Sequence, residues 1–418
     1  MTRTSSEDPA GTYRAALRVG EFDAVAGAGL ISILGDSAAY LAVTVLVFQR
    51  TGSALLAALT FTIAFMPYLL GGTLLAALVD RVRPKTLLIG IDLAGAALLT
   101  VAATGGVPIP VLYAAIFAVG ALAPIRSGTA AALIAEVLPG DTFLAGRSLQ
   151  RICSQTGQIV GTGLGGALVG AFGPRGALLA DVASFLLSAT VTAVGVRARP
   201  VAGRTGTERT GTERTNSSLI AASLAAVREV WSHQPVRRLL LLGWVVPFVA
   251  VAPEGLGAPA VAQSGHSAAL VGVWMAAIPI GTVAGDLIVM WTVPPPQRRH
   301  LTWAPAIVLT VLLITFGTGP PLGVALALLV ATGAASVCGL GLDQALRDRT
   351  EPGLRARTYT LFSTGLMVTQ GLGFATAGAL GQILSADDTV AVAGSAGLVA
   401  VLTLAWNSHR ADAAPPSR

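Results

Sequence analysis

Long apolar blocks, each of about 20 residues, limit what this chain can fold into. A helix rises 1.5 Å per residue, so a block of this length spans the roughly 30 Å hydrocarbon core of a bilayer. The blocks do not alternate between apolar and polar residues, which argues against a transmembrane β-barrel. Only 11% of the 418 residues are charged, against about 25% in soluble domains. The chain is therefore predicted to be an all-α integral membrane protein.

The apolar blocks predict twelve transmembrane helices in two pseudo-symmetric six-helix bundles. The spans are placed at 22–48, 55–79, 86–105, 110–135, 147–172, 175–196, 236–262, 268–292, 301–318, 321–345, 357–384 and 388–407. The long polar stretch at 197–235 contains a direct RTGTE repeat and is predicted to be a flexible cytoplasmic linker. The predicted parts are an N-terminal tail at 1–21, bundles at 22–196 and 236–407 on either side of the linker, and a tail at 408–418.

The two predicted bundles resemble each other. Residues 136–170 and 349–381 share the order of proline, arginine, glutamine and glycine, and each stretch leads from a predicted cytoplasmic loop into a glycine-rich span. Such internal duplication is typical of secondary transporters, whose substrate site lies near the midplane between the repeats.

The distribution of basic residues predicts the orientation. With the N-terminus in the cytoplasm, 24 of the 27 Lys and Arg residues fall on cytoplasmic segments. Only Arg50 and Arg175 fall outside, and Arg126 lies within a span. This is the bias of the positive-inside rule. We expect a multi-pass protein of the inner (plasma) membrane with both termini in the cytoplasm. The net charge of +6 is therefore attributed to topology and not to a nucleic-acid partner.

Two acidic residues within spans are candidates for proton coupling or substrate binding. Asp36 lies about 20 Å along the first span. A carboxylate at such a depth costs about 2.5–3.5 kcal/mol, so it must face a cavity or a partner. Burial disfavours the charged form, which suits reversible protonation. Glu254 in the seventh span is the second candidate. A packing role for Asp36, bonded to neighbouring hydroxyl groups, stays open.

Arg126 and several aromatic residues complete the predicted substrate region. Arg126 could contact substrate, or it could snorkel or pair with Asp92 on the third span. The aromatic residues that could line a cavity for an apolar substrate are Tyr40, Tyr68, Trp244, Phe248 and Trp274.

Four stretches of this sequence resemble the major facilitator superfamily. They lie at 25–60, 65–92, 124–141 and 178–189, and the last reads LLADVASFLLSA. The resemblance covers nearly all of 22–407 and is closest to the efflux branch that contains macrolide exporters and the enterobactin exporter. It implies proton-coupled export by alternating access.

Two motifs of that family have counterparts here. Asp80 and Arg81, with Lys85, resemble the loop motif between the second and third helices. The resemblance implies that Asp80 interacts with the start of the eleventh helix, near Arg355 and Arg357, and locks the cytoplasmic gate. The alternative is that these charges only obey the positive-inside rule.

The fifth span carries the second motif, a glycine pattern that resembles the packing motif of the antiporters. Small residues in such a pattern let helices approach closely. Thr162 stands where the family pattern has proline, and general glycine-mediated packing is the alternative. The motif residues are Gly157, Gly161, Thr162, Gly165 and Gly166.

These observations favour a secondary transporter that exports a drug-like molecule or natural product in exchange for protons. Uptake of a small metabolite and a non-transporting membrane sensor or scaffold are the alternatives. We expect no enzymatic activity, no cofactor beyond the proton gradient, and a monomer. No phosphate-binding Gly-x4-Gly-Lys-Ser/Thr loop is present. The four histidines and two cysteines do not cluster in the sequence, so no metal site is expected.

Overall fold

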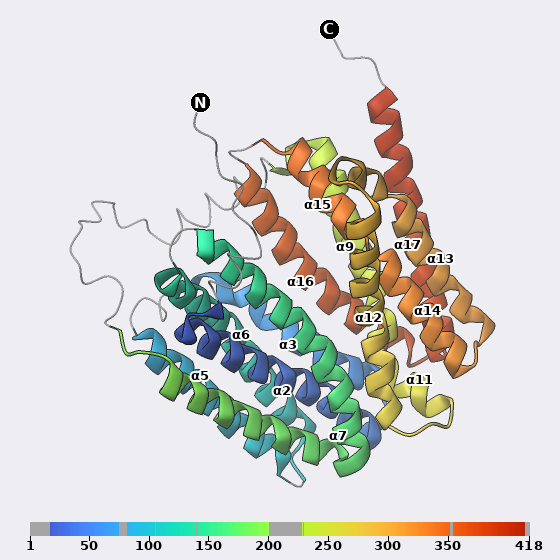
Figure 1. Cartoon of the computed structure of the whole chain (residues 1–418). Helices are drawn as coiled ribbons and strands as arrows, with labels where there is room; N and C mark the ends of the chain where they lie inside the picture. Colours follow the sequence, from blue (N-terminus) through green and yellow to red (C-terminus); the bar gives the residue numbers. More distant parts are fainter. Residues whose placement is uncertain are drawn as a thin grey trace, which may run out of the picture. The chain divides into compact units, whose positions relative to one another are not determined.

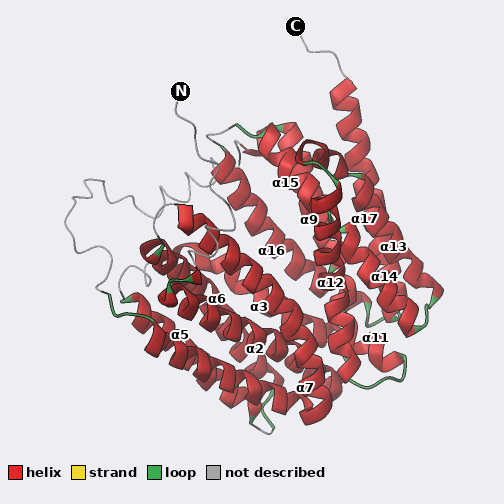
Figure 2. Ribbon diagram, viewed as in Figure 1, coloured by secondary structure: helices red, strands yellow, loops and turns green. Residues whose placement is uncertain are grey.

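The computed structural model describes residues 17–74, 82–104, 106–138, 141–199, 228, 230–351 and 354–413. These residues form helices joined by short loops, and none of them is in a strand (Figure 2). The chain divides into two compact units. Unit 1 comprises residues 1–46 and 66–206, and unit 2 comprises 47–65 and 207–418. Residues 47–65 thus group with unit 2, although the predicted division at 197–235 assigns them to the first bundle; that division stays a prediction.

Unit 1 is built from long helices (Figure 1). They are α2 (Gly20–Thr51), whose last residues belong to unit 2, the unit 1 part of α3 (Ala54–Leu74), α5 (Pro84–Ala103), α6 (Ile109–Val137) and α7 (Asp141–Gly195). Pro84 is the first residue of α5, a position where proline costs no hydrogen bond. Helix α5 packs mainly against α6 and α7. Phe22, Leu133, Ile134 and Leu138 form a buried apolar cluster where α2 begins and α6 ends.

A break divides α7 into the two spans expected at 147–172 and 175–196. Gly173 has φ +72° and ψ 173°, a conformation that side chains other than glycine rarely adopt, and Pro174 follows it. The helix therefore reverses into a second arm at this residue, and each arm is long enough to cross a bilayer.

Unit 2 contains a larger number of shorter elements. They are the unit 2 part of α3 (Ala54–Leu74), α9 (Gln234–Ala250), α10 (Ala252–Gly255), α11 (Gly257–Gln263), α12 (Ala269–Thr292), η1 (Pro295–Leu301), α13 (Ala304–Ile314), η2 (Thr315–Thr318), α14 (Leu322–Ala335), α15 (Cys338–Arg349), α16 (Arg355–Leu380) and α17 (Ala386–Ala413). The main packing partners are α12 with α14, α13 with α17, and α9 with both α16 and α17.

Two of the predicted spans in unit 2 are interrupted helices. The seventh is divided into α9, α10 and α11 by breaks at Val251 and Leu256. The tenth is divided into α14 and α15 at Ser336 and Val337. In a bilayer, interrupted helices are tolerated where the freed backbone groups lie inside the protein or line a cavity.

The elements given above for the described residues form twelve helical segments when each interrupted helix counts once, the 3-10 helices η1 and η2 count with α13, and the two arms of α7 count separately. By length and apolar composition alone, eight helices qualify as membrane spans and two shorter apolar helices are added. In that count of eight, α7 is a single helix that begins at Ile152. It does not include α16, which carries several threonines and Gln370. The twelve segments follow the twelve predicted spans within a few residues.

Candidate functional site

Unit 1 contains a cavity of about 310 Å³ that is lined by residues of α2, α5, α6 and α7. Asp36 and Tyr40 reach it from α2, Arg126 from α6, and Gln150 and Gln158 from α7. Three of the four residues predicted for coupling or substrate binding therefore share one cavity. The two glutamines were not predicted as site residues, although Gln158 is the glutamine that the repeat at 136–170 shares with the one at 349–381.

Asp36 faces this cavity with an incomplete set of hydrogen bonds. Its side chain is half-buried, and Oδ1 is fully buried with no hydrogen-bond partner among the described residues. The hydroxyl of Ser32, one turn earlier on α2, is also buried and lacks a partner there. Leaving a buried polar group unsatisfied costs about 1–3 kcal/mol. A proton or a ligand group that reaches Oδ1 would remove this cost.

Arg126 is held by a buried network beside the cavity. It forms an ion pair with Asp92 of α5, whose side chain is fully buried. Ser188 of α7 donates a 2.6 Å hydrogen bond to the second oxygen of Asp92 and accepts one of 3.1 Å from Arg126. Of the alternatives that the sequence leaves open for Arg126, the structure contains the pairing with Asp92. The pair leaves Arg126 at the wall of the cavity, where its charge also acts on Asp36.

Asp181 is the third buried carboxylate of unit 1. It lies on the second arm of α7, is fully buried, and accepts a 2.7 Å hydrogen bond from Ser184. Its Oδ2 has no partner among the described residues, and it interacts electrostatically with Asp36. The buried polar set of Asp36, Asp92, Asp181 and Arg126 holds three carboxylates and one guanidinium group. Full ionisation would leave two negative charges uncompensated, which a low-dielectric interior disfavours.

The glycine pattern of the fifth span lies against α2. Gly157, Gly161 and Gly165 recur every four residues and so share one face of α7. A Cβ atom at these positions would lie 2.9 Å from Leu30, 2.6 Å from the Leu34 carbonyl oxygen and 2.7 Å from the Ala38 Cα, respectively. The backbones of α2 and α7 therefore touch along the segment of α2 that carries Asp36.

The two remaining motif residues differ from these three glycines. Thr162 donates a 2.8 Å hydrogen bond to the Gln158 carbonyl within its own helix, and Gly166 is buried.

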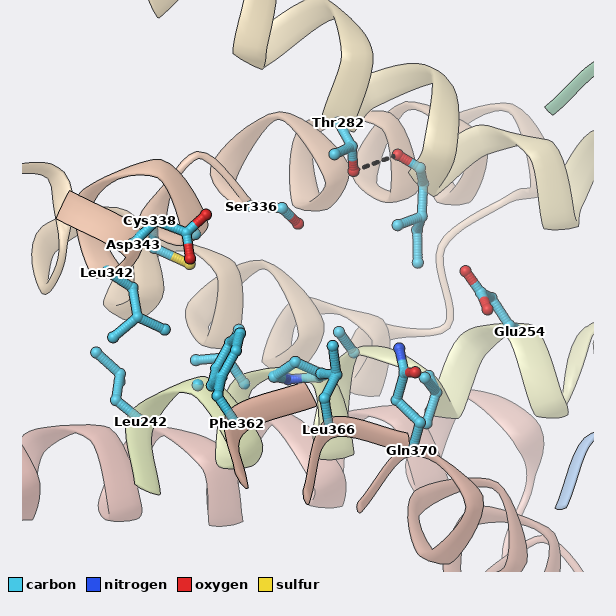
Figure 3. A pocket seen from close by; sticks show the side chains of 17 residues that line it. Leu242, Glu254, Thr282, Ser336, Cys338, Leu342, Asp343, Phe362, Leu366 and Gln370 are labelled. Atoms are coloured by element: carbon cyan, nitrogen blue, oxygen red, sulfur yellow. Dashed lines mark hydrogen bonds between the residues drawn. The ribbon is translucent and has the colours of Figure 1, made fainter. Parts of the chain in front are cut away.

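Unit 2 encloses a second cavity, of about 340 Å³, where its two interrupted helices meet. Glu254 of α10 and Gln370 of α16 reach toward it from different helices (Figure 3). Ser336, in the break between α14 and α15, and Cys338, the first residue of α15, also line it. Glu254 was the second predicted coupling candidate. The sequence did not indicate that the seventh span is interrupted on both sides of it.

The predicted aromatic residues have mixed positions. Of those whose side chains the structure describes, Tyr40 lines the cavity of unit 1 and the others line neither of the two cavities. Trp244 donates a 3.1 Å hydrogen bond to the Phe362 carbonyl and stacks on Trp231, and Trp274 is buried and donates a 2.7 Å bond to the Pro253 carbonyl. Phe362, which was not predicted, lines the cavity of unit 2. The side chain of Tyr68 lies outside the described residues, and Phe248 is not among the lining residues.

The predicted gate falls mostly outside the described residues. Asp80 and Arg81 lie outside the described residues. The side chains of Arg355 and Arg357 also lie outside them, although the backbone of both residues is in the first turn of α16. Lys85 is described, and its amino group donates a 2.7 Å hydrogen bond to the Ala193 carbonyl at the end of α7. The gate therefore stays a prediction. Among the residues that the structure describes, no group of His, Cys, Asp and Glu could hold a metal ion.

Residues 25–342, well over half of the chain, match the sequence profile of the Major Facilitator Superfamily. The chain belongs to this superfamily. It is therefore a multi-pass membrane transporter with twelve helices in two pseudo-symmetric bundles, a secondary transporter of small molecules and not an enzyme. No curated protein sequence matches the chain.

Solved structures of this superfamily share the fold. A bacterial homologue of the human lysosomal transporter Spinster, inward-facing and unoccupied, is 15% identical with a TM-score of 0.67 over 95% of this chain and 96% of that one. The nucleoside transporter NupG is 14% identical with a TM-score of 0.68 over 92% and 98%. A D-xylose–proton symporter is 14% identical with a TM-score of 0.67 over 92% and 96%. At such identities the similarity concerns the fold alone.

Proposed function

We propose that this transporter exports a small drug-like molecule or natural product across the plasma membrane in exchange for protons. The observation that carries the proposal is the carboxylate of Asp36, which faces a cavity while its buried Oδ1 lacks a partner among the described residues. A carboxylate in that position changes its interactions whenever it gains or loses a proton, because only the protonated form can donate a hydrogen bond.

Arg126 supports a coupling role for Asp36 in this proposal. Its guanidinium group is fixed by Asp92 and Ser188, so it stays at the cavity wall whether or not Asp36 is charged. A charged Asp36 is attracted to that fixed positive charge, and a neutral one is released from it. The protonation state of Asp36 can thereby change the balance between two conformations of the transporter, as alternating access requires.

Export, as opposed to uptake, is supported by the sequence resemblance to the efflux branch and by the glycine face of α7. That face brings α7 against the segment of α2 that carries Asp36. A displacement of α7 along this contact would therefore reach the coupling carboxylate directly. In this proposal both termini and the 197–235 linker lie in the cytoplasm, and Asp80 with Arg355 and Arg357 forms the cytoplasmic gate.

The test is efflux from preloaded cells that lack their own exporters. We expect wild-type protein to expel a fluorescent substrate while the proton gradient is present, and Asp36→Asn to abolish that efflux while reaching the membrane in normal amount. Asp23→Asn is the matched control, because Asp23 is exposed on the same helix. Normal gradient-dependent efflux in Asp36→Asn would refute the coupling role, and inward accumulation by wild type would refute the direction.

A further inference from the structure

Among the residues that the structure describes, the lining of the unit 2 cavity includes the carboxylate of Glu254 and no positively charged residue that could balance it. Of the 17 residues in the described chain that line this cavity, Glu254 and Asp343 are acidic and none is Lys, Arg or His. No described residue donates a hydrogen bond to the Glu254 carboxylate or forms an ion pair with it. The cavity of unit 1 differs, because Arg126 lies in its wall.

The remaining polar groups of this cavity are mainly hydrogen-bond acceptors. The Thr282 hydroxyl donates to the Ile278 carbonyl of its own helix at 3.0 Å, as Figure 3 shows, and the Ser336 hydroxyl donates to the Thr332 carbonyl. Each hydroxyl has one proton to donate, so its oxygen is left to accept. Gln370 is the lining side chain that offers both a donor and an acceptor.

The rest of the lining is apolar. Leu242, Val246, Phe362 and Leu366 are among these residues. A cavity of about 340 Å³ lies at the lower end of the size range of small-molecule sites, about 300–1,000 Å³. It therefore fits one aromatic ring system with a short side chain. Aromatic rings such as that of Phe362 also attract cations.

The position of Glu254 is held by the local fold. It lies in the single turn of α10, between the breaks at Val251 and Leu256. Trp274 of α12 donates a 2.7 Å hydrogen bond to the carbonyl of Pro253, the residue before it. Gly255, the residue after it, has no room for a Cβ, which would lie 2.9 Å from the Phe374 ring. The carboxylate is thus presented by a fixed backbone.

We infer that the cavity of unit 2 binds the ammonium group of a cationic, partly apolar substrate, with Glu254 as its counter-ion. The inference rests on the proposed transport function and names the substrate class for it. An uncompensated carboxylate in an apolar cavity needs a proton or a cation, and an ammonium group supplies both charge and donors. The acceptor oxygens of Thr282 and Ser336 complete the match to a ligand that carries three N–H groups.

The test measures binding without any gradient, so that it does not depend on transport. Purified full-length protein in detergent is titrated by calorimetry with 2-(1-naphthyl)ethylamine and with its N-acetyl derivative, which keeps the ring system and loses the charge. We expect the amine to bind the wild type roughly 10- to 100-fold more tightly, the range for a hydrogen bond to a charged group.

Variants assign the effect to one side chain. Glu254→Gln is expected to weaken amine binding roughly 10- to 100-fold and to change binding of the N-acetyl derivative by no more than about threefold. Glu254→Asp keeps the charge and should keep the preference for the amine. Glu351→Gln is the matched control, because Glu351 is an exposed glutamate of the same unit, and it should bind both probes as the wild type does.

Two results would overturn the inference. One is equal or absent binding of the two probes by the wild type, which needs no variant. The other is unchanged amine affinity in Glu254→Gln that still binds the N-acetyl derivative and is therefore folded. Failure of this inference can be distinguished from failure of the proposed function. If the proposed function is wrong, proton-coupled efflux is absent while the preference for the amine persists. If the inference is wrong, the preference for the amine is absent while efflux of another compound continues.

Discussion

Replacement of Gly161 by alanine tests whether the contact between α2 and α7 stabilises the protein. A Cβ at this position would lie 2.6 Å from the Leu34 carbonyl oxygen, 2.9 Å from the Leu34 Cα and 3.0 Å from the Ser37 Cβ. Two of these three atoms belong to the backbone of α2, so no side-chain rotation can relieve the overlap. The two helices must move apart near Asp36.

The required displacement sets the size of the effect. Ordinary van der Waals contact begins at 3.4 Å, so the closest pair must separate by 0.8 Å. A radial gap of about 0.5–1 Å forfeits roughly a quarter to a half of the dispersion energy of each affected atom pair. Overpacked sites typically lose about 1–3 kcal/mol of unfolding free energy. We expect Gly161→Ala to fall in this range after correction for helix propensity.

The variant Gly163→Ala measures the correction for helix propensity. Gly163 lies on the same helix two residues later, and no atom lies within 4 Å of the Cβ that alanine would add. Gly163→Ala should therefore show only the gain in helix propensity, at most about 1 kcal/mol. Both variants are compared with wild type by denaturant unfolding in detergent micelles. If Gly161→Ala is as stable as Gly163→Ala, the close helix contact described above is refuted.

Three further predictions concern the ion pair, the orientation and the gate. Asp92→Asn leaves Arg126 without its buried carboxylate and should lower the unfolding free energy by about 3–5 kcal/mol. The control Asp388→Asn, at an exposed residue, should have a far smaller effect. Equal stabilities of the two variants would mean that the ion pair of Arg126 and Asp92 is not buried. A cysteine at Thr207, in the proposed cytoplasmic linker, should resist impermeant thiol reagents in intact cells, and labelling from outside would overturn the orientation. Asp80→Asn should favour the inward-open conformation, slow turnover more than it weakens binding and raise thiol accessibility near Gly140. A change of about 1.4 kcal/mol in the free-energy difference between the two conformations is enough to shift their equilibrium about tenfold. Unchanged accessibility with normal transport would show that Asp80 does not act as a gate.

The positions of the helices could be predicted from the sequence, because apolar length decides them in a bilayer. The predicted boundary between the fifth and sixth spans coincides with Gly173 and Pro174, whose conformational preferences force a break. The interruption around Glu254 could not be predicted in this way. Helix α6 continues through Pro124, whereas the seventh span breaks on both sides of Pro253. The two prolines differ in their tertiary packing, since Trp274 donates a hydrogen bond to the Pro253 carbonyl. Such packing depends on residues distant in the sequence and cannot be predicted from the local sequence.

The candidate site was predictable only in part, for a similar reason. Charged residues within apolar spans are rare, so Asp36, Arg126 and Glu254 could be recognised individually. Their surroundings depend on residues distant in the sequence. Ser188, which joins Asp92 to Arg126, lies 62 residues from Arg126, and the sequence does not indicate that it contacts either residue.

Proton movement in proteoliposomes would show whether substrate export is coupled to protons through Asp36. An outward gradient of a transported substrate is imposed on vesicles that contain purified protein and a trapped pH indicator, with no initial pH difference. Wild-type protein should move protons opposite to the substrate, and Asp36→Asn should move no protons although it still exchanges substrate. Substrate flux without proton flux in the wild type, or an unchanged proton flux in Asp36→Asn, would refute proton coupling through Asp36.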